Sequence, residues 1–271
     1  MAGLSALLTE QSLSGGMPYF DYEVTVARGI LIPWLTAQGV DIRGKRIGDF
    51  GCHQGGVLEA LRQAGASGGL GIELNADVVA QSPFHQDAAF RLKAGDILAL
   101  PEHPTPDQCF DVILLRDVLE HVPDTHSALA VAKRMLAPGG KIFISFPPYY
   151  SPFGGHQHEA GDWTRIVPYL HYLPDGLFYA LLGGADNVYM NREDALDDIR
   201  SVRHTRMTLG KAEAAFARAG LTIAGYTYYL LRPEFKVRYA IPALNAGVLG
   251  HVPFLREVWT MGVYYLLEAA A

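Results

Sequence analysis

The stretch that decides the fold is RIGDFGCHQGGVLE at residues 46–59, followed by GIEL at residues 71–74. An apolar strand ending at Asp49 leads into a glycine-rich turn and a helix-like segment, and a second strand ends in Glu73. Glycines let the backbone approach a ligand closely, and a helix N-terminus offers unpaired N–H groups to an anion. An acid at the end of the second strand can accept hydrogen bonds from both ribose hydroxyls. This order predicts a site for a nucleoside cofactor.

Short apolar runs alternate with helical patterns along much of the chain. Such alternation is typical of an α/β fold in which helices cover both faces of a parallel sheet. We expect seven strands, at residues 45–50, 69–73, 90–94, 110–115, 140–146, 221–231 and 258–267. We expect helices near residues 55–64, 75–82, 117–120, 125–136 and 208–219. The pattern therefore predicts a doubly wound sheet.

Two segments interrupt this alternation and suggest a division into parts. Residues 148–206 are rich in aromatic, histidine, proline and glycine residues and follow the fifth expected strand. They leave the sheet at its carboxyl edge, where ligands bind in open α/β sheets, so we interpret them as an inserted lid that recognises the substrate. Residues 232–257 form a second, proline-containing interruption. The cofactor domain would then comprise residues 45–147 and 207–271, with residues 1–44 as a helical cap over the cofactor.

Composition argues against several kinds of partner. The formal net charge is −6 and charged residues make up 18% of the chain. Clustered lysines and arginines, which a nucleic-acid surface needs, are not seen, so nucleic acid is not an expected partner. The two cysteines, Cys52 and Cys109, form no disulfide framework, which suits a reducing cytoplasm. We expect a cytoplasmic protein with no transmembrane segment, in which the apolar region 235–267 serves a homodimer or a weak membrane-surface contact.

Several motifs, in order, resemble those of the class I S-adenosylmethionine-dependent methyltransferases, especially the small-molecule enzymes of quinone biosynthesis. IGDFGC at 47–52 is similar to the first motif, GIEL to the second, and KAGDILALP at 93–101 to the third. FDVILLRDVLEHVPD at 110–124 resembles the fourth motif and its following helix, and LAPGGKIFISFP at 136–147 the fifth strand with its preceding turn. TLGKAEAAFARAGLTI at 208–223 resembles the late helix and sixth strand.

This resemblance implies a Rossmann-like, mostly parallel sheet with an antiparallel last strand. It also implies S-adenosylmethionine as cofactor, with S-adenosylhomocysteine as product. Glu73 would accept hydrogen bonds from the ribose hydroxyls, and Asp96 would receive the adenine amino group. His53 stands where the family usually has glycine. The full implied set for the cofactor is Tyr19, Asp49, Gly51, Cys52, His53, Gly55, Glu73, Leu74, Asp96, Ile97, Arg116 and Asp117.

Methyl transfer requires a base only where the acceptor must lose a proton, and histidine suits that task because its pKa lies near neutrality. We favour His156, which follows Gly154-Gly155, and consider His158 and His121 as further candidates. A metal site built on His156 and His158 with Glu159 or Asp162 is chemically possible, but the His-x-His spacing is common by chance, and no metal is expected.

Aromatic residues dominate the expected lid and predict an apolar, ring-containing or sugar-containing acceptor. The same residues would equally serve as the lid's own core. O-methylation of a hydroxyl is the favoured reaction, and N- or C-methylation and an inactive cofactor-binding protein stay open as alternatives. A nicotinamide dehydrogenase would share the glycine loop but shows no second catalytic motif here. The expected substrate contacts are Tyr149, Tyr150, Phe153, Trp163, Tyr169, His171 and Tyr172.

Overall fold

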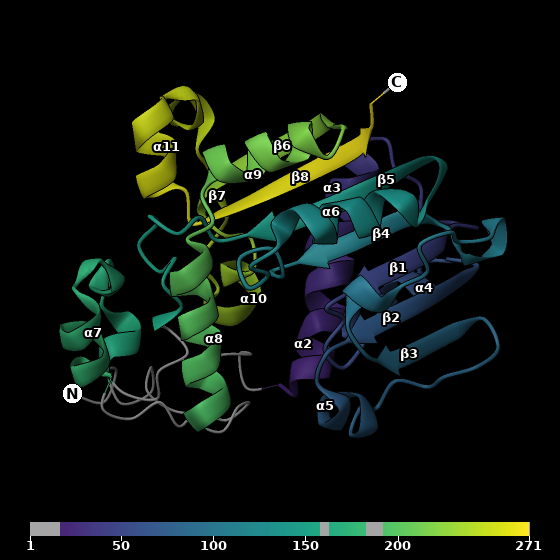
Figure 1. Ribbon diagram of the computed structural model, residues 1–271, viewed down its shortest axis with the longest axis horizontal. Coiled ribbons are helices and arrows are strands. Elements are labelled where there is room, and N and C mark those ends of the chain that lie inside the picture. Colours follow the sequence, from purple (N-terminus) through teal and green to yellow (C-terminus); the bar gives the residue numbers. More distant parts are fainter. Residues whose placement is uncertain (1–16, 158–162, 183–191, 271) are drawn as a thin grey trace.

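One mixed sheet forms the centre of the computed structural model, which describes residues 17–157, 163–182 and 192–270 (Figure 1). Its strands lie in the order β3-β2-β1-β4-β5-β8-β6-β7. The strands are β1 (Arg46–Phe50), β2 (Gly68–Glu73), β3 (Phe90–Ala94), β4 (Phe110–Arg116), β5 (Leu136–Phe146), β6 (Leu221–Leu231), β7 (Leu244–Asn245) and β8 (Gly262–Ala269).

Strand directions confirm the predicted mixed sheet. Strands β1 to β5 pair in parallel, and β8 lies antiparallel between β5 and β6. The predicted number of strands was one too low, because the two-residue strand β7 pairs with the end of β6. Two residues are too few to show an alternating pattern. The last strand begins only at Gly262, since helix α11 (Pro253–Trp259) takes up the start of the expected range.

Helices cover both faces of the sheet, as the alternation of apolar runs predicted (Figure 1). In β4, Ile113 and Leu115 face one hydrophobic cluster, while Val112 and Leu114 face the other. The first cluster includes residues of α6 (Thr125–Arg134) and α9 (Leu209–Arg218). The second includes residues of α4 (Gly56–Gln63) and of the N-terminal helices. Because both faces are buried, β4 reads as a continuous apolar run.

The N-terminal helices cross the start of α4. They form one continuous run of α2 (Tyr19–Val26), the π-helical η2 (Ala27–Leu31) and α3 (Ile32–Ala37). A Cβ added to Gly56 would lie 2.5 Å from the carbonyl oxygen of Phe20, so only glycine permits this close approach. The approach places the first turn of α2 beside the carboxyl edge of the sheet.

The remaining elements lie in the connections and the lid segment. The predicted helix at residues 117–120 is wrong, because the chain turns there and Asp117 has a φ of 51°. In the lid segment, Leu170, Phe178, Leu182 and Ile199 form a small core of their own. The lid elements are η6 (Trp163–Ile166), η7 (Leu170–Tyr172), α7 (Asp175–Leu181) and α8 (Arg192–Thr205). Others are α5 (Ala76–Ala80), η3 (Ile97–Ala99), η4 (Pro106–Gln108), α10 (Phe235–Tyr239) and η8 (Gly247–His251).

Among the residues that the structure describes, none of the helices is both long and apolar enough to cross a membrane.

Candidate active site

A cavity of about 1070 Å³ lies at the carboxyl edge of the sheet. Residues at or just after the ends of β1, β2, β4 and β6 line it, together with residues of α2 and α10. Ligand pockets usually measure some hundreds to about 1,000 Å³, so this cavity has room for a nucleoside cofactor and a second small molecule. The lining includes most of the predicted cofactor residues: Tyr19, Asp49, Gly51, Cys52, His53, Glu73, Leu74, Asp96, Ile97, Arg116 and Asp117. Gly55 lies outside the lining and caps α4 instead.

The glycine loop after β1 owes its shape to left-handed backbone positions. Gly51 and Gly55 have φ values of 81° and 79°, and His53 has 47°. A side chain at Gly51 would also collide with Val118, whose Cγ2 atom would lie 2.4 Å from the added Cβ. Left-handed backbone costs about 1–2 kcal/mol in a residue other than glycine. His53 thus keeps the backbone conformation that glycine favours, and its ring packs 4.5 Å from that of Tyr19, centroid to centroid.

Glu73 ties this loop to the second strand. Its Oε2 accepts a hydrogen bond of 2.9 Å from the His53 N–H, and its Oε1 accepts one of 3.0 Å from the Asn75 N–H. Each carboxylate oxygen has a second lone pair, so both can still accept from a ligand. Asp96 uses one oxygen to accept from the Leu98 N–H at 2.8 Å. The two acids are therefore fixed on the cavity wall with acceptor capacity left for ribose and adenine groups.

Two buried carboxylates, Glu23 and Asp49, also line the cavity. Burial raises the pKa of Glu23 to about 8, although Arg116 lies 3.3 Å away and opposes the shift. Burial likewise raises the pKa of Asp49 to about 7 against the influence of Arg116. Among the described residues, Glu23 Oε2 and Asp49 Oδ2 have no hydrogen-bond partner. A cationic amine, such as the one on the methionine part of the expected cofactor, would satisfy both the missing hydrogen bonds and the charge.

We expect the ligand-free protein to lose stability as the pH rises from about 4 to about 8. In the folded state Glu23 and Asp49 hold their protons to higher pH than in the unfolded chain, where they ionise near pH 4, so unfolding releases protons in this window. Thermal unfolding between pH 4.5 and 8.5 would measure the decline. Asp49→Asn, which cannot ionise, should show a shallower decline, and identical slopes in the two proteins would contradict the assignment.

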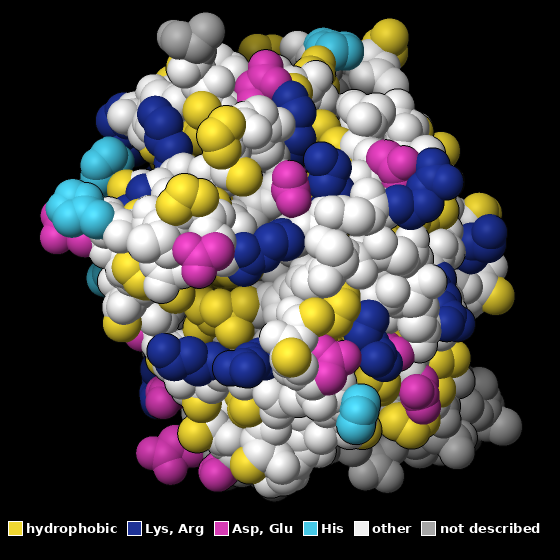
Figure 2. All heavy atoms as spheres, turned by 90° about the vertical axis from the view of Figure 1, so that its right-hand side faces the viewer, with side chains coloured by type: hydrophobic (Ala, Val, Ile, Leu, Met, Phe, Trp, Pro, Cys, Tyr) yellow, Lys and Arg dark blue, Asp and Glu magenta, His cyan; other side chains and the backbone are white. Residues whose placement is uncertain are grey.

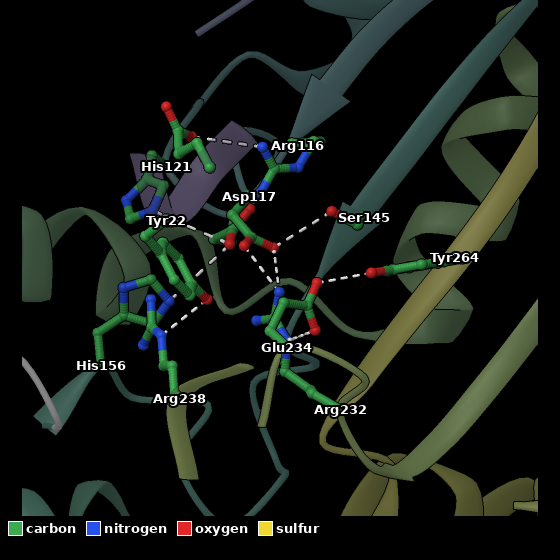
Figure 3. Close-up of polar contacts among 12 residues, drawn as sticks. Tyr22, Arg116, Asp117, His121, Ser145, His156, Arg232, Glu234, Arg238 and Tyr264 are labelled. Atoms are coloured by element: carbon green, nitrogen blue, oxygen red, sulfur yellow. Dashed lines mark hydrogen bonds and ion pairs between the residues drawn. The ribbon is translucent and has the colours of Figure 1, made fainter. Parts of the chain in front are cut away.

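Asp117 lies at the centre of a polar network that joins four strands (Figure 3). Arg232 Nη2 lies 3.0 and 2.7 Å from its two carboxylate oxygens, and the Ser145 hydroxyl lies 3.4 Å from one of them. Arg232 also bonds Glu234, which accepts a 2.6 Å hydrogen bond from Tyr264. Burial alone would raise the pKa of Asp117, but its arginine neighbours outweigh burial and lower it to about 2. A fixed, ionised carboxylate therefore follows β4.

Two histidines meet a carboxylate pair on the lid side of the cavity, and we call Glu120, His121, His156 and Asp198 the histidine cluster. His121 Nδ1 lies 3.2 Å from Asp198 Oδ1, and His156 Nδ1 lies 3.0 Å from Asp198 Oδ2. The Nε2 atoms of His121 and His156 lie 3.9 and 3.8 Å from Glu120 Oε1. Figure 3 shows both imidazoles beside Asp117. The cluster thus joins the turn after β4, the loop after β5, and α8.

The hydrogen bonds of the cluster fix which ring nitrogens carry protons. A carboxylate only accepts, so His156 donates from Nδ1 to Asp198. The Ser201 hydroxyl donates to the Asp198 carbonyl at 2.7 Å, so His121 Nδ1, 2.9 Å from the Ser201 oxygen, is also a donor. In the neutral rings Nε2 therefore carries the lone pair in both histidines. Burial, followed by the nearby charge of Asp117, raises the pKa of Glu120 well above its usual range.

Most of the predicted substrate residues lie away from the cavity. Phe153 lines it. His171 is buried and donates from Nε2 to the Tyr149 carbonyl at 2.6 Å, which holds the loop, and burial lowers its pKa to about 4. His158 lies outside the described residues. The predicted residues outside the lining are Tyr149, Tyr150, Trp163, Tyr169, His171 and Tyr172.

Several cavity residues were not among the sequence predictions. Arg232 and Glu234 follow β6, and Arg238 lies on α10, where its Nε donates to the Tyr22 hydroxyl at 2.8 Å. β6 runs parallel to β5, so the position after its end was a usable signal for Arg232. Asp198 lies on a helix far away in sequence, and no pattern marked it.

The loop that carries His156 depends on two glycines. A Cβ on Gly155 would lie 2.1 Å from the His171 Cβ, and one on Gly154 would lie 2.1 Å from the Pro148 carbonyl oxygen. Overpacking of this kind usually costs about 1–3 kcal/mol. We expect Gly155→Ala to lower the melting temperature by several degrees in a thermal unfolding assay. Gly176→Ala is the matched control, because nothing lies within 4 Å of its added Cβ, and equal melting temperatures for the two variants would refute this packing argument.

Comparisons with known proteins agree with this geometry. A family model described as a methyltransferase domain matches residues 28–177, more than half of the chain. A ubiquinone biosynthesis O-methyltransferase of Pseudomonas entomophila is 34% identical over 119 residues, which cover 42% of this chain and 49% of that protein. The chain thus spans about half the length of several curated relatives that it matches. A Pseudomonas fluorescens protein of the same name is 34% identical over 229 residues, 79% of this chain and 84% of the relative.

Solved structures show the same fold at low sequence identity. An S-adenosylmethionine-dependent methyltransferase from Mesorhizobium loti has a TM-score of 0.52 at 20% identity and covers 87% of this chain and 95% of its own. Geranyl diphosphate C-methyltransferase from Streptomyces coelicolor, solved with S-adenosyl-L-homocysteine, has a TM-score of 0.53 at 14% identity, with coverage of 89% and 77%. The motifs, the sheet order and the family match agree, and the chain belongs to the class I S-adenosylmethionine-dependent methyltransferases.

Proposed function

We propose that this enzyme methylates a hydroxyl group of a small, largely apolar acceptor, and that the histidine cluster accepts the hydroxyl proton. The observation that carries the proposal is the pair of histidines on the cavity wall, both with Nδ1 beside Asp198 and with Nε2 as the acceptor atom. An N-methyltransferase acting on a neutral amine has less need of such a base. His121, whose side chain is 24% exposed, is the more accessible ring, and His156, at 8%, stands behind it.

The cofactor residues fit S-adenosylmethionine, which supplies an electrophilic methyl group on a sulfonium. Glu73 and Asp96 would hold the ribose and adenine, and the glycine loop with Asp49 would hold the amino-acid part. Arg116 ends β4 and Asp117 follows it, and both line the same cavity as the histidines. The protein would thus contribute orientation, exclusion of water and proton removal, which suffice for a displacement of this kind.

An apolar acceptor is supported by the outer part of the cavity. Five apolar or aromatic side chains from the lid, α10 and the chain before β8 line it: Phe153, Ile166, Tyr239, Ile241 and Met261. Residues 148–206 would therefore act as the substrate-recognition lid through this wall. The face shown in Figure 2 has basic side chains interspersed with acidic ones, which does not favour a nucleic-acid substrate. The curated relatives are named ubiquinone biosynthesis O-methyltransferases, which also favours O-methylation.

A matched acceptor panel tests this proposal. Phenols and catechols with apolar tails would be compared with the corresponding anilines and with small charged acids, using isotope-labelled S-adenosylmethionine and mass spectrometry of the products. We expect methylated oxygen in the apolar phenols and little product from the others. Methylation of the anilines alone, or of none of the panel with the cofactor bound, would refute the hydroxyl assignment.

A further inference from the structure

We infer that Glu120, His121 and His156 form a binding site for one divalent transition-metal cation such as Zn²⁺. The three residues each offer one ligand atom, and these atoms all lie within 4.8 Å of one another. Two imidazole nitrogens and a carboxylate oxygen are a donor set typical of catalytic zinc sites. The inference revises the sequence expectation of no metal, which considered only the spacing of His156 and His158.

The distances between the ligand atoms suit an ion. Separations of 3.8 and 3.9 Å between Glu120 Oε1 and the two Nε2 atoms are too long for hydrogen bonds. A zinc ion bonded at about 2.0–2.2 Å to each atom would hold neighbouring ligands about 3.3 Å apart in tetrahedral geometry. The two glutamate–imidazole separations would therefore have to shorten by about 0.5 Å, and the separation between the two imidazole atoms, at most 4.8 Å, by no more than about 1.5 Å, which side-chain adjustment allows.

Asp198 provides the outer support that metal-binding histidines usually have. Histidines that bind metals generally donate their other ring N–H to a carboxylate or carbonyl group, which fixes the tautomer. Here His156 Nδ1 donates to Asp198 at 3.0 Å, and His121 Nδ1 donates to the Ser201 hydroxyl at 2.9 Å and lies 3.2 Å from the same carboxylate. In both histidines Nε2 is left as the ligand atom on the side of Glu120.

Glu120 itself is an independent sign that a cation fits this place. Its side chain is 1% exposed, and neither carboxylate oxygen has a hydrogen-bond partner among the described residues. A buried carboxylate without compensation is costly, and a cation bound beside it would remove that cost. Because the ligands include two imidazoles, the site suits a transition metal better than Mg²⁺ or Ca²⁺, which prefer oxygen ligands.

The role of this ion rests on the proposed function, whereas its binding does not. His121 and His156 line the cavity, so an ion between them would stand at the wall where the acceptor hydroxyl is expected. With the ion bound, it would lower the pKa of a ligated hydroxyl, whose proton would pass to water. In the metal-free protein the Nε2 atoms would accept that proton themselves.

Metal titration of the full-length protein tests the site directly. Protein stripped by a chelator would be titrated with Zn²⁺ and with Mg²⁺ by calorimetry, and with Co²⁺ by visible absorption. The cluster variants are Glu120→Gln, His121→Gln, His156→Gln and Asp198→Asn. His126→Gln is the matched control, because His126 is an exposed histidine on α6 close to His121 in sequence. Titration with S-adenosylhomocysteine would report whether each variant remains folded.

We expect one equivalent of Zn²⁺ in the wild type and in His126→Gln, and no measurable binding of Mg²⁺. Affinity should fall at least about 100-fold in the histidine variants and about 10–100-fold in Asp198→Asn. No uptake of Zn²⁺ by the wild type, or equal affinity in the control and the cluster variants, would overturn the inference. An active enzyme that takes up no Zn²⁺ overturns the site alone, whereas Zn²⁺ binding without product from any hydroxyl refutes only the proposed function.

Discussion

Replacing Glu73 with alanine is expected to weaken cofactor binding by about 100-fold. A hydrogen bond to a charged group contributes about 1.5–3 kcal/mol, and two ribose hydroxyls would lose their common acceptor. The variant also removes the acceptor of the His53 N–H, so the glycine loop loses its tie to β2. Water can replace that bond because Glu73 is only half-buried, and the fold should therefore persist.

Calorimetric titration with S-adenosylmethionine would measure this loss. Glu102→Ala is the control, since Glu102 is exposed and lies outside the cavity lining. Glu73→Gln separates the two contributions, because an amide oxygen can still accept one N–H but carries no charge. Equal affinities for wild type and Glu73→Ala would mean that another group binds the ribose.

The sheet was predictable because its signals are local. The central parallel strands β1 and β4 are short, largely apolar runs with both faces buried, and they are followed directly by Gly51 and Asp117. The strand β7 was missed because two residues carry no periodicity. The expected helix at residues 117–120 failed for another reason: the left-handed conformation of Asp117 is stabilised by Arg232, which lies far along the chain.

That most of the residues predicted to hold the cofactor line one cavity was predictable for the same reason, since they lie at or just after the ends of β1, β2 and β4. The grouping of residues on the lid side of the cavity was not predictable. His121, His156 and Asp198 come from three segments, and only packing brings them together. Histidine-rich sequence pointed to His156 but gave no information on its partner. The aromatic residues of the lid misled in part, because tyrosines such as Tyr149 and Tyr172 pack with His171 rather than with the cavity.

Replacing His121 or His156 with alanine is expected to reduce kcat by about 10²- to 10⁴-fold while leaving cofactor affinity within about threefold of the wild type. Under the proposed function, either change removes a ring beside the acceptor, and neither histidine is among the residues expected to hold the cofactor. Steady-state kinetics with the best acceptor from the panel, together with calorimetry of the cofactor, would measure both quantities. Full activity in both variants would eliminate the histidines as proton acceptors.

The two histidines are further expected to act as a unit. Because the two carboxylate oxygens of Asp198 lie 3.2 and 3.0 Å from the Nδ1 atoms of His121 and His156, losing one ring leaves the other with a loosened partner. The double variant should therefore be only slightly slower than the slower single variant, as in other catalytic groups that depend on one another. Asp198→Asn, a change in a positioning residue, should lower kcat less and shift the acidic limb of the pH–rate profile to lower pH, since the loss of the carboxylate makes the histidines less basic. Strictly multiplicative losses in the double variant would indicate two independent roles, with only one histidine near the reacting hydroxyl.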